Sequence, residues 1–360
     1  HCPHRGADLS YGRLEDGGLR CLYHGWLFDR TGRCLEQPGE PAGSTFYQRI
    51  RHTAYPCLEA AGLVFAYLGP GEPPLLPAYE PFLVPDEQRF VNRVYQECNY
   101  LQANEGNIDP AHVSFLHRQF RLRDPRAVPG SQTSADILYN RDVSPTLAVE
   151  ETSYGLRIFS VRRAGPEGQY VRITNFVYPN LSAIVGNQGR VGAGYSIHWH
   201  VPIDDERHWR YEITFSRTGP LDKEAYRREI AAEMTPDRRL IRNQANRYLQ
   251  DRAAMLTENY TGMGRYFPAH DAYATETQGP IQDRTQEHLG YTDKAITRAR
   301  LMLLRGIRDV QEGRDPPHVV RAPEANRFPD LVVLSQVVPD GVDWRTAWRV
   351  ASAAGAPAAG

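Results

Sequence analysis

The sequence predicts an α+β protein, with a small all-β domain at the N-terminus and a larger domain in which helices pack on one large antiparallel sheet. Three observations lead to this fold class. Short β-type runs between glycine turns fill residues 1 to about 68, longer β-type runs follow from about 85 to 217, and the apolar period becomes helical after about 220. Helices that pack on one antiparallel sheet make an α+β domain.

The first domain contains the β-type runs "GLRCLYHGWLF" and "AGLVFAYLG", separated by turn signals such as Asp16-Gly17-Gly18 and Thr31-Gly32. The stretch "GPGEPPLLP", residues 69–77, combines glycines with prolines and marks a semi-rigid boundary. We therefore assign residues 1–77 to the β domain and its linker, 78–330 to the second domain, and 331–360 to a C-terminal tail.

The second domain contains six β-type runs, interrupted at 100–120. Hairpin-length gaps among these runs favour a single antiparallel sheet. Three helical segments follow, and Thr292 is a plausible N-cap for the last of them. The strands are "RFVNRVYQE", "LAVEETS", "LRIFSVRR", "QYVRITNFVY", "GYSIHWHVPI" and "HWRYEITFSR". The helices are "DKEAYRREIAAEM", "DRRLIRNQANRYLQDRAAM" and "TDKAITRARLMLLRGIRDVQEG".

The composition is that of an ordinary soluble globular chain, for which we expect small neutral or weakly charged partners. Of its 360 residues, 41% are apolar, and the formal net charge is -1. Acidic and basic residues are interspersed, which argues against a nucleic-acid tract or an anionic membrane surface. No apolar run approaches the ~18 residues that span a bilayer, and no basic start leads into an apolar h-region. We therefore expect a cytoplasmic protein.

The five cysteines are an odd number spread along the chain, which makes a poor disulfide framework. Reduced thiols or metal ligands are the better interpretation. A site at Cys2 would have no preceding strand to support it, so we expect that an N-terminal segment precedes residue 1.

Two cysteine–histidine pairs stand near the start, in "HCPHRG" and "CLYHGW". A zinc site could use them, because zinc accepts two cysteines and two histidines tetrahedrally. Such zinc sites usually pair like with like, whereas each loop here mixes one cysteine with one histidine. A [2Fe-2S] cluster of Rieske type, in which two histidines replace two cysteines on one iron, suits the mixture better. The candidate ligands are Cys2, His4, Cys21 and His24.

A second constellation, Asp109, His112 and His117, lies in "NIDPAHVSFLH". On a straight helix Asp109 and His112 share a face, while His112 and His117 point about 140° apart. Asp109 followed by Pro110 suits a helix start, and we expect a bend or bulge beyond it that turns His117 back. Two histidines and one carboxylate on one face would suit a non-haem Fe(II) oxygenase. A chance match of this spacing is the alternative.

These motifs resemble those of a known enzyme family. The stretches "CPHRGADLSYG" and "CLYHGWLFD" are similar to the Rieske domain of aromatic-ring oxygenases, and "NYLQANEGNIDPAHVSFLH" resembles the iron-binding segment of Rieske non-haem iron oxygenases. The stretches "RNQANRYLQDR" and "HDAYATETQGPIQDRTQEHLGYTDKAI" are similar to the phthalate-dioxygenase-type branch. The resemblance extends to about residue 325. It falls short at the start, where family members carry additional strands before the first Rieske cysteine.

The resemblance implies a catalytic domain with a helix-grip type of sheet, a Rieske [2Fe-2S] cluster and a mononuclear Fe(II). It also implies a homotrimer or trimer-based assembly and a separate reductase or ferredoxin supplied by NAD(P)H. In such enzymes electrons enter at the cluster and pass to the iron, where O2 is activated beside an aromatic substrate.

The third iron ligand is a distant carboxylate, and by its position in the family pattern Asp271 matches it. Asp283 is the second choice, although "DRTQEH" favours a helical ion-pair cluster in which Arg284 meets Glu287 or His288. His270 is either a partner behind the ligands or a surface residue. Glu287 and Asp293 are the other two candidate carboxylates.

Asp109 is too close in sequence to His112 to be an independent ligand of the same iron. A carboxylate three residues from a metal-binding histidine is instead well placed to accept the free N–H of that histidine. In the resembling enzymes the matching aspartate also reaches a cluster histidine of the neighbouring subunit. The resemblance therefore implies a bridge from His24 through Asp109 to His112 across a subunit interface.

Other polar side chains are candidates for the substrate side. Ser196, His198 and His200 alternate on one strand face, as cavity lining or as a satisfied network. Arg172 and Arg190 could pair an aromatic carboxylate, with an exposed role as the alternative.

The sequence thus predicts the oxygenase component of a Rieske non-haem iron system, with O-demethylation of a methoxylated aromatic acid as its reaction. The resemblance is to aromatic-acid O-demethylases such as 5,5'-dehydrodivanillate O-demethylase. Ring hydroxylation or dihydroxylation of a phthalate-like or chlorobenzoate-like acid is the alternative. A Rieske electron carrier or a zinc-binding module is the non-enzyme alternative, but a carrier needs no second domain.

Overall fold

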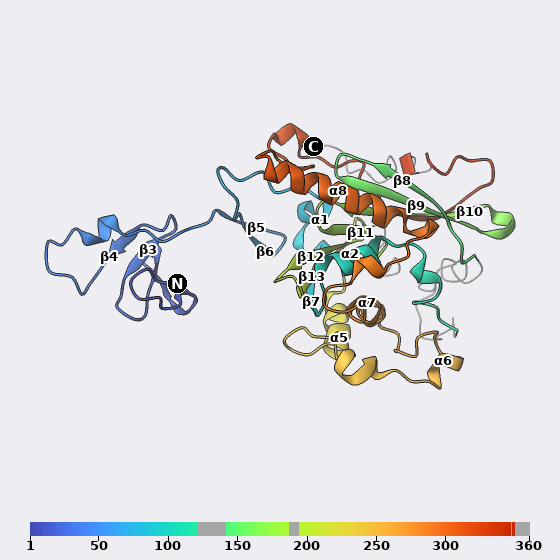
Figure 1. The fold of residues 1–360 in the computed structure, drawn as a ribbon, viewed down its shortest axis with the longest axis horizontal. Helices are drawn as coiled ribbons and strands as arrows, with labels where there is room; N and C mark the ends of the chain where they lie inside the picture. The colour runs from blue at the N-terminus through green and yellow to red at the C-terminus, as the bar shows by residue number, and fades with distance from the viewer. Residues whose placement is uncertain (121–141, 187–193, 347, 350–360) are drawn as a thin grey trace. The chain divides into compact units, whose positions relative to one another are not determined.

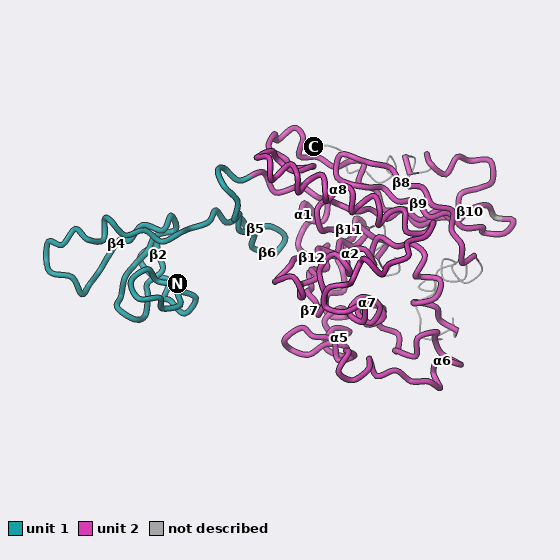
Figure 2. Tube along the Cα trace, viewed as in Figure 1, with its two compact units in different colours: residues 1–73 teal, residues 74–360 magenta. Residues whose placement is uncertain are grey.

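The computed structural model describes residues 1–120, 142–186, 194–346 and 348–349. The chain divides into two compact units, His1–Pro73 and Pro74–Gly360 (Figure 2). The boundary falls inside the proline-rich stretch 69–77. Within the described ranges, no helix combines the length and the apolar character needed to cross a membrane.

The first unit is all-β. Four three-residue strands form one sheet in the order β1-β2-β3-β4, and β5 pairs with β6 in a separate hairpin. Its small core contains Trp26 and Phe28 together with Cys2, Cys21 and Cys34. The strands are β1 (Arg13–Glu15), β2 (Gly18–Arg20), β3 (Leu27–Asp29), β4 (Cys34–Glu36), β5 (Cys57–Ala60) and β6 (Leu63–Ala66).

The second unit is built on one eight-stranded sheet. Seven strands follow the path β7-β13-β12-β11-β10-β9-β8, and the eighth, β14, pairs with β10 beside this path. All of these pairs are antiparallel. The α+β fold class is therefore confirmed (Figure 1). The strands are β7 (Arg89–Gln96), β8 (Thr146–Glu151), β9 (Gly155–Arg163), β10 (Gln169–Val177), β11 (Leu181–Ile184), β12 (Ser196–Pro202), β13 (His208–Phe215) and β14 (Leu334–Val338).

Two helices pack on one face of this sheet. The α2 residue Ile108 and the α8 residues Ala299 and Met302 share a core with Ile158 and Phe176 of the sheet. In Figure 1 the long helix α8 crosses in front of β8 and β9. The helices are α1 (Glu80–Leu83), α2 (Tyr100–Ile108), α5 (Lys223–Glu233), α6 (Ala254–Thr257), α7 (Phe267–Glu276) and α8 (Lys294–Gln311).

Three sequence-based expectations about the second unit are wrong. Residues 331–360 are not all a tail, because β14 pairs with β10 and Val332 and Leu334 join the core. The predicted helix over 237–255 is mostly irregular, because Arg247, Tyr248 and Leu249 all have positive φ, which a right-handed helix excludes. The N-cap of α8 is Asp293 rather than Thr292.

Candidate functional site

The two cysteine–histidine loops share one backbone design. In each loop the cysteine carbonyl accepts the N–H of the glycine four residues later, from Gly6 to Cys2 at 2.9 Å and from Gly25 to Cys21 at 3.0 Å. Both glycines have positive φ, +76° and +73°, which a residue with a Cβ adopts only at a cost. Two separate loops therefore turn in the same way around their cysteines.

The cysteine and histidine side chains of these loops differ in their exposure to solvent. The thiols of Cys2 and Cys21 are buried, whereas His4 and His24 are exposed, with ring centroids 4.5 Å apart. His4 stacks on the buried Trp26, with ring centroids 4.4 Å apart. Burial, and then the neighbouring Cys21 thiol, raise the pKa of the Cys2 thiol. Buried thiols become thiolates only beside a compensating cation, so this donor set fits a cluster with thiolates inside and imidazoles at the surface.

The helix that leads to the second constellation ends before its histidines. The α2 helix stops at Ile108, and Asp109 is its C-cap in extended conformation. His112 begins a short 3-10 turn, His112–Ser114. The expected break between Asp109 and His117 is confirmed, but Asp109 ends one helix and does not start another. The Asp109 side chain instead accepts the Ala111 N–H at 2.7 Å, which starts the turn.

His112, His117 and Asp271 meet at one point. The Asp271 Oδ1 atom lies 3.0 Å from His117 Nε2 and 4.0 Å from His112 Nε2, and the three ligand atoms lie within 4.8 Å of one another. Metal–nitrogen bonds of about 2.1 Å at right angles place neighbouring donor atoms about 3 Å apart. Two imidazoles and one carboxylate at this spacing fit one octahedral face of Fe(II), with positions left for O2 and substrate.

The charges around this point favour an ionised carboxylate. Burial by itself would raise the pKa of Asp271, but His117, and then His112 and the buried Arg210, hold that pKa well below its usual range. The His112 Nδ1 atom lies 3.5 Å from Asp109 Oδ2. Burial opposes protonation of His112, yet the Asp109 carboxylate raises the His112 pKa. Asp109 is therefore placed to orient the ring of His112.

Asp283, the second choice for the carboxylate, lies elsewhere. It is exposed and caps a short 3-10 turn, Arg284–Gln286, by accepting the Thr285 N–H at 3.0 Å. Arg284 meets Glu287 at 3.5 Å, as the sequence suggested, although no regular helix forms there. Asp271 is the carboxylate that the structure brings to the histidines. His270 is fully buried, so the surface alternative for it is wrong.

Long-range contacts hold the ligand loop, and the sequence analysis missed them. Arg162 of β9 is buried under the loop and donates to the Pro110 carbonyl at 2.7 Å. Beyond His117, Gln119 bridges to Asn259, which stands shortly before α7 in the chain. No local sequence pattern predicts this role of Arg162, because in the sequence it is only one polar residue near the end of a strand.

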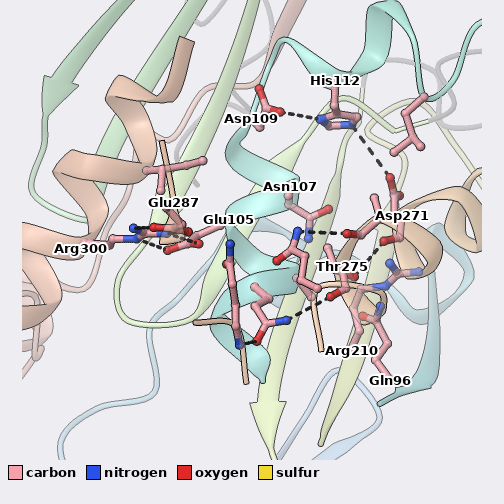
Figure 3. Close-up of a pocket in the computed structure, with 18 of the residues that line it drawn as sticks. Gln96, Glu105, Asn107, Asp109, His112, Arg210, Asp271, Thr275, Glu287 and Arg300 are labelled. Atoms are coloured by element: carbon pink, nitrogen blue, oxygen red, sulfur yellow. Dashed lines mark hydrogen bonds and ion pairs between the residues drawn. The ribbon is translucent and has the colours of Figure 1, made fainter. Parts of the chain in front are cut away.

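A cavity of about 170 Å³ adjoins the metal-binding point (Figure 3). Asp109, His112 and Asp271 border it, and Figure 3 shows these side chains with Asn107 and Arg210 around the same space. Farther along the cavity wall, Arg300 of α8 forms ion pairs with Glu105 of α2 and with Glu287. Small molecules can therefore reach the histidine and carboxylate groups from this side.

The polar face of β12 is a network. Ser196 Oγ lies 2.7 Å from Thr214 Oγ1, and Asn107 Nδ2 lies 2.6 Å from His200 Nε2. His198 Nδ1 lies 3.2 Å from Asn107 Oδ1. Burial lowers the pKa of His198 to about 4. Arg172 is half-buried on β10, and Arg190 lies outside the described residues.

Comparisons with family models cover nearly the whole chain. A model described as "Rieske [2Fe-2S] domain" matches residues 1–55. A model described as "LigXa C-terminal domain like" matches residues 66–357.

Several curated proteins are similar to the chain. The phthalate 4,5-dioxygenase oxygenase subunit of Pseudomonas putida is 34% identical, over 96% of this chain and 79% of that protein. The 5,5'-dehydrodivanillate O-demethylase oxygenase subunit of Sphingobium sp. is 32% identical, over 91% and 70%. The 3-chlorobenzoate-3,4-dioxygenase oxygenase subunit of Comamonas testosteroni is 31% identical, over 97% and 82%.

Solved structures share the fold. Dicamba monooxygenase bound to dicamba superposes with a TM-score of 0.56 at 15% identity, over 87% of this chain and 86% of that one. NdmA of Pseudomonas putida CBB5, a mutant with caffeine, gives 0.55 at 16% identity, over 95% and 84%.

Proposed function

This chain belongs to the Rieske non-haem iron oxygenases, and we propose that it acts on an aromatic acid, with O-demethylation of a methoxylated acid as its reaction. The family uses a Rieske [2Fe-2S] cluster and a mononuclear iron. In the proposed reaction, the methoxy carbon is hydroxylated and leaves as formaldehyde, while the aromatic ring keeps the oxygen as a phenol. One O2, two electrons and two protons are consumed, and one water is formed.

The observation that carries the proposal is the presence of two complete donor sets in one chain. Cys2, Cys21, His4 and His24 would hold the cluster, on two loops of matching backbone design. His112, His117 and Asp271 would hold the iron, because their ligand atoms lie within 4.8 Å of one another. When bound, the cluster supplies single electrons and the iron supplies the place where O2 is reduced.

Other residues of the chain position the ligands of the proposed iron site. Asp109 Oδ2 lies 3.5 Å from the Nδ1 edge of His112, where it can orient the ring with Nε2 toward Asp271. Arg162 anchors the loop that carries both histidines through the Pro110 carbonyl. The adjoining cavity admits a small substrate beside Asp271.

The named relatives support an aromatic acid as the substrate, and they are compatible with two different reactions on it. The similarity to a dehydrodivanillate O-demethylase subunit, at 32% identity, favours demethylation. The similarity to phthalate and chlorobenzoate dioxygenase subunits, at 34% and 31% identity, favours ring hydroxylation or dihydroxylation as the second candidate. Both outcomes need the same donor set, so the cavity wall would select between them.

We further propose a homotrimer or trimer-based assembly supplied by an NAD(P)H-dependent reductase or a ferredoxin. In this assembly His24 of the partner subunit would meet Asp109, and the bridge would continue to His112. The position of Asp109 supports this bridge, because Asp109 borders the cavity and its carboxylate lies 3.5 Å from His112 Nδ1.

Two measurements test the proposal. Iron and acid-labile sulfide analysis should give three irons and two sulfides per chain, whereas an electron carrier would give two of each and a zinc protein neither. Substrate-dependent O2 uptake should then be compared between methoxylated and unmethoxylated aromatic acids, with formaldehyde measured alongside. O2 uptake with methoxylated acids but without formaldehyde would show ring hydroxylation in place of O-demethylation. No uptake with either class would remove aromatic acids as substrates.

A further inference from the structure

One face of α7 contacts three sides of the same imidazole. Phe267, His270 and Asp271 are related by steps of three and four residues, so they share a helix face. The Phe267 ring lies against the ring of His117, with centroids 4.7 Å apart and planes 22° apart. Asp271 Oδ1 lies 3.0 Å from His117 Nε2, and His270 Nδ1 lies 3.4 Å from His117 Nδ1. A single helix therefore meets both ring nitrogens and one face of His117.

The rings of His117 and His270 meet edge to edge. Their planes are 22° apart and their centroids 5.6 Å apart, while their Nδ1 atoms are only 3.4 Å apart. The two nitrogens therefore point toward each other in nearly the same plane, which is the arrangement of a long N–H···N hydrogen bond and not of face-to-face stacking.

The hydrogen-bond partners determine which nitrogen carries the proton. His270 Nε2 lies 3.1 Å from the Gly264 carbonyl oxygen, which only accepts, so Nε2 of a neutral His270 carries the hydrogen. Its Nδ1 is then an acceptor. A His117 that offers Nε2 to a metal carries its own hydrogen on Nδ1, and that hydrogen points at His270 Nδ1. The contacts with Gly264 and His117 are consistent with each other, and the Leu116 backbone is a further acceptor near the His270 ring.

We propose that His270 is the positioning residue of His117: it accepts the His117 Nδ1–H and so directs His117 Nε2 toward Asp271 and the iron. This inference rests on the proposed iron site. The two histidine ligands would then be oriented in different ways, His112 by the carboxylate of Asp109 and His117 by the neutral imidazole of His270. A neutral imidazole attracts the N–H hydrogen of a metal-binding histidine less strongly than a carboxylate does. His117 and His112 would therefore differ in basicity.

Substitutions at His270 separate its two hydrogen bonds. In His270→Asn the amide oxygen stands where Nδ1 was and still accepts from His117. In His270→Gln the amide nitrogen stands where Nε2 was, so the bond to Gly264 is kept and the acceptor is lost. His270→Phe loses both. Thr261→Val is the matched control, because Thr261 Oγ1 lies 3.4 Å from His270 Nε2 on the side away from His117.

The first readout is the affinity for ferrous iron, measured by chelator competition on the full chain with its Rieske cluster loaded. We expect His270→Phe and His270→Gln to weaken binding by about 10- to 100-fold, and His270→Asn and Thr261→Val to stay within about threefold of the wild type. The second readout is the EPR spectrum of the ferrous site with nitric oxide as probe. It should change in the Phe and Gln variants and be kept in the Asn variant.

Wild-type affinity and spectrum in His270→Phe, or rescue by Gln instead of Asn, would overturn the role of His270. If His270→Phe loses its fold, shown by its melting temperature, the comparison of Asn with Gln decides. Asp271→Ala and Asp283→Ala report on the underlying site: Asp271→Ala should lose the mononuclear iron and Asp283→Ala keep it. The reverse result would overturn the iron site itself, whereas loss in Asp271→Ala with no effect at His270 would remove only the positioning role.

Discussion

Asp109 lies at the end of α2, with its carboxylate 3.5 Å from His112 Nδ1 and 2.7 Å from the Ala111 N–H. Burial would raise its pKa, but the neighbouring His112 holds the Asp109 pKa below its ordinary value, so the residue is a carboxylate at neutral pH. A half-buried anion at this position can orient one imidazole of its own chain and, in the proposed assembly, His24 of the partner subunit.

Asp109→Asn tests that role, because it keeps the size of the side chain and removes its charge. We expect the variant to keep the Rieske absorption and most of its iron, since neither donor set is altered. Its reduced cluster should stay reduced when substrate and O2 are added, because the amide holds both imidazoles more weakly. Single-turnover stopped-flow absorbance measures this, and normal cluster oxidation with normal product formation would exclude Asp109 from the electron path.

His208 is a second residue whose protonation has a measurable consequence. It is fully buried, with Nδ1 2.8 Å from the Cys98 carbonyl, and burial lowers its pKa to about 4. The unfolded chain, with an ordinary histidine pKa of about 6.5, binds more protons than the folded chain between these values. Stability should therefore fall as the pH falls from about 6.5 toward 4, by about 2 kcal/mol at pH 5 from this residue alone.

The variant His208→Asn isolates this effect. Its amide nitrogen stands where Nδ1 was and can still donate to the Cys98 carbonyl, but it does not titrate. We expect the urea midpoint of the variant to fall less between pH 7 and pH 5 than that of the wild type. Equal pH dependence in the two proteins would show that His208 is not a source of the acid sensitivity.

At the scale of elements, ion pairs join the helices that surround the cavity. Arg300 of α8 pairs with Glu105 of α2 and with Glu287 at 2.6 and 2.5 Å. The side chains of the two glutamates are only 7% and 11% exposed, so each needs a partner. Gln102 of α2 likewise donates to the Thr275 carbonyl of α7 at 3.0 Å. These contacts set the spacing of α2, α7 and α8.

Arg300→Met should lower the free energy of unfolding by about 2–4 kcal/mol, because it leaves two buried carboxylates short of a cation. Arg284 still pairs with Glu105 at 3.0 Å, which keeps the loss from being larger. The matched control is Arg305→Met on the same helix, whose pair with Glu151 is about half-exposed and should cost under about 1 kcal/mol. Urea unfolding of both variants measures the difference, and equal losses would contradict a structural role for the Arg300 cluster.

At the scale of the whole molecule, the two donor sets lie in different compact units. The proposed assembly pairs the cluster of one chain with the iron of the next, so neither chain needs both groups. A chain with Cys21→Ala should lack the cluster, and a chain with Asp271→Ala should lack the iron. Each should be inactive alone.

Co-assembly of these two variants should restore part of the activity, because some interfaces then pair an intact cluster with an intact iron site. Unfolding and refolding, or co-expression with two different tags, would give mixed assemblies whose substrate-dependent O2 uptake can be measured. Mixed assemblies with no activity, beside active reassembled wild type, would rule out transfer between chains.

Some features of this protein follow from the sequence by itself. The cluster loops are local: within six residues, each supplies its cysteine, its histidine and the glycine that closes the turn. The break after α2 was also predictable, because a spacing of five residues splays two imidazoles on a straight helix. Long strands with β-type composition marked most of the sheet in the same way.

The tertiary structure alone decided the rest, because contacts between residues far apart in sequence depend on how whole elements pack. His117 meets His270 and Asp271 across more than 150 residues, and the link of Gln119 to Asn259 helps to bring the two segments together. Strand β14 joined the sheet because β10 offered an unpaired stretch and the core accepted Val332 and Leu334. Asp271 was assigned from a family pattern, but its place beside both histidines is set by α7 packing against α2.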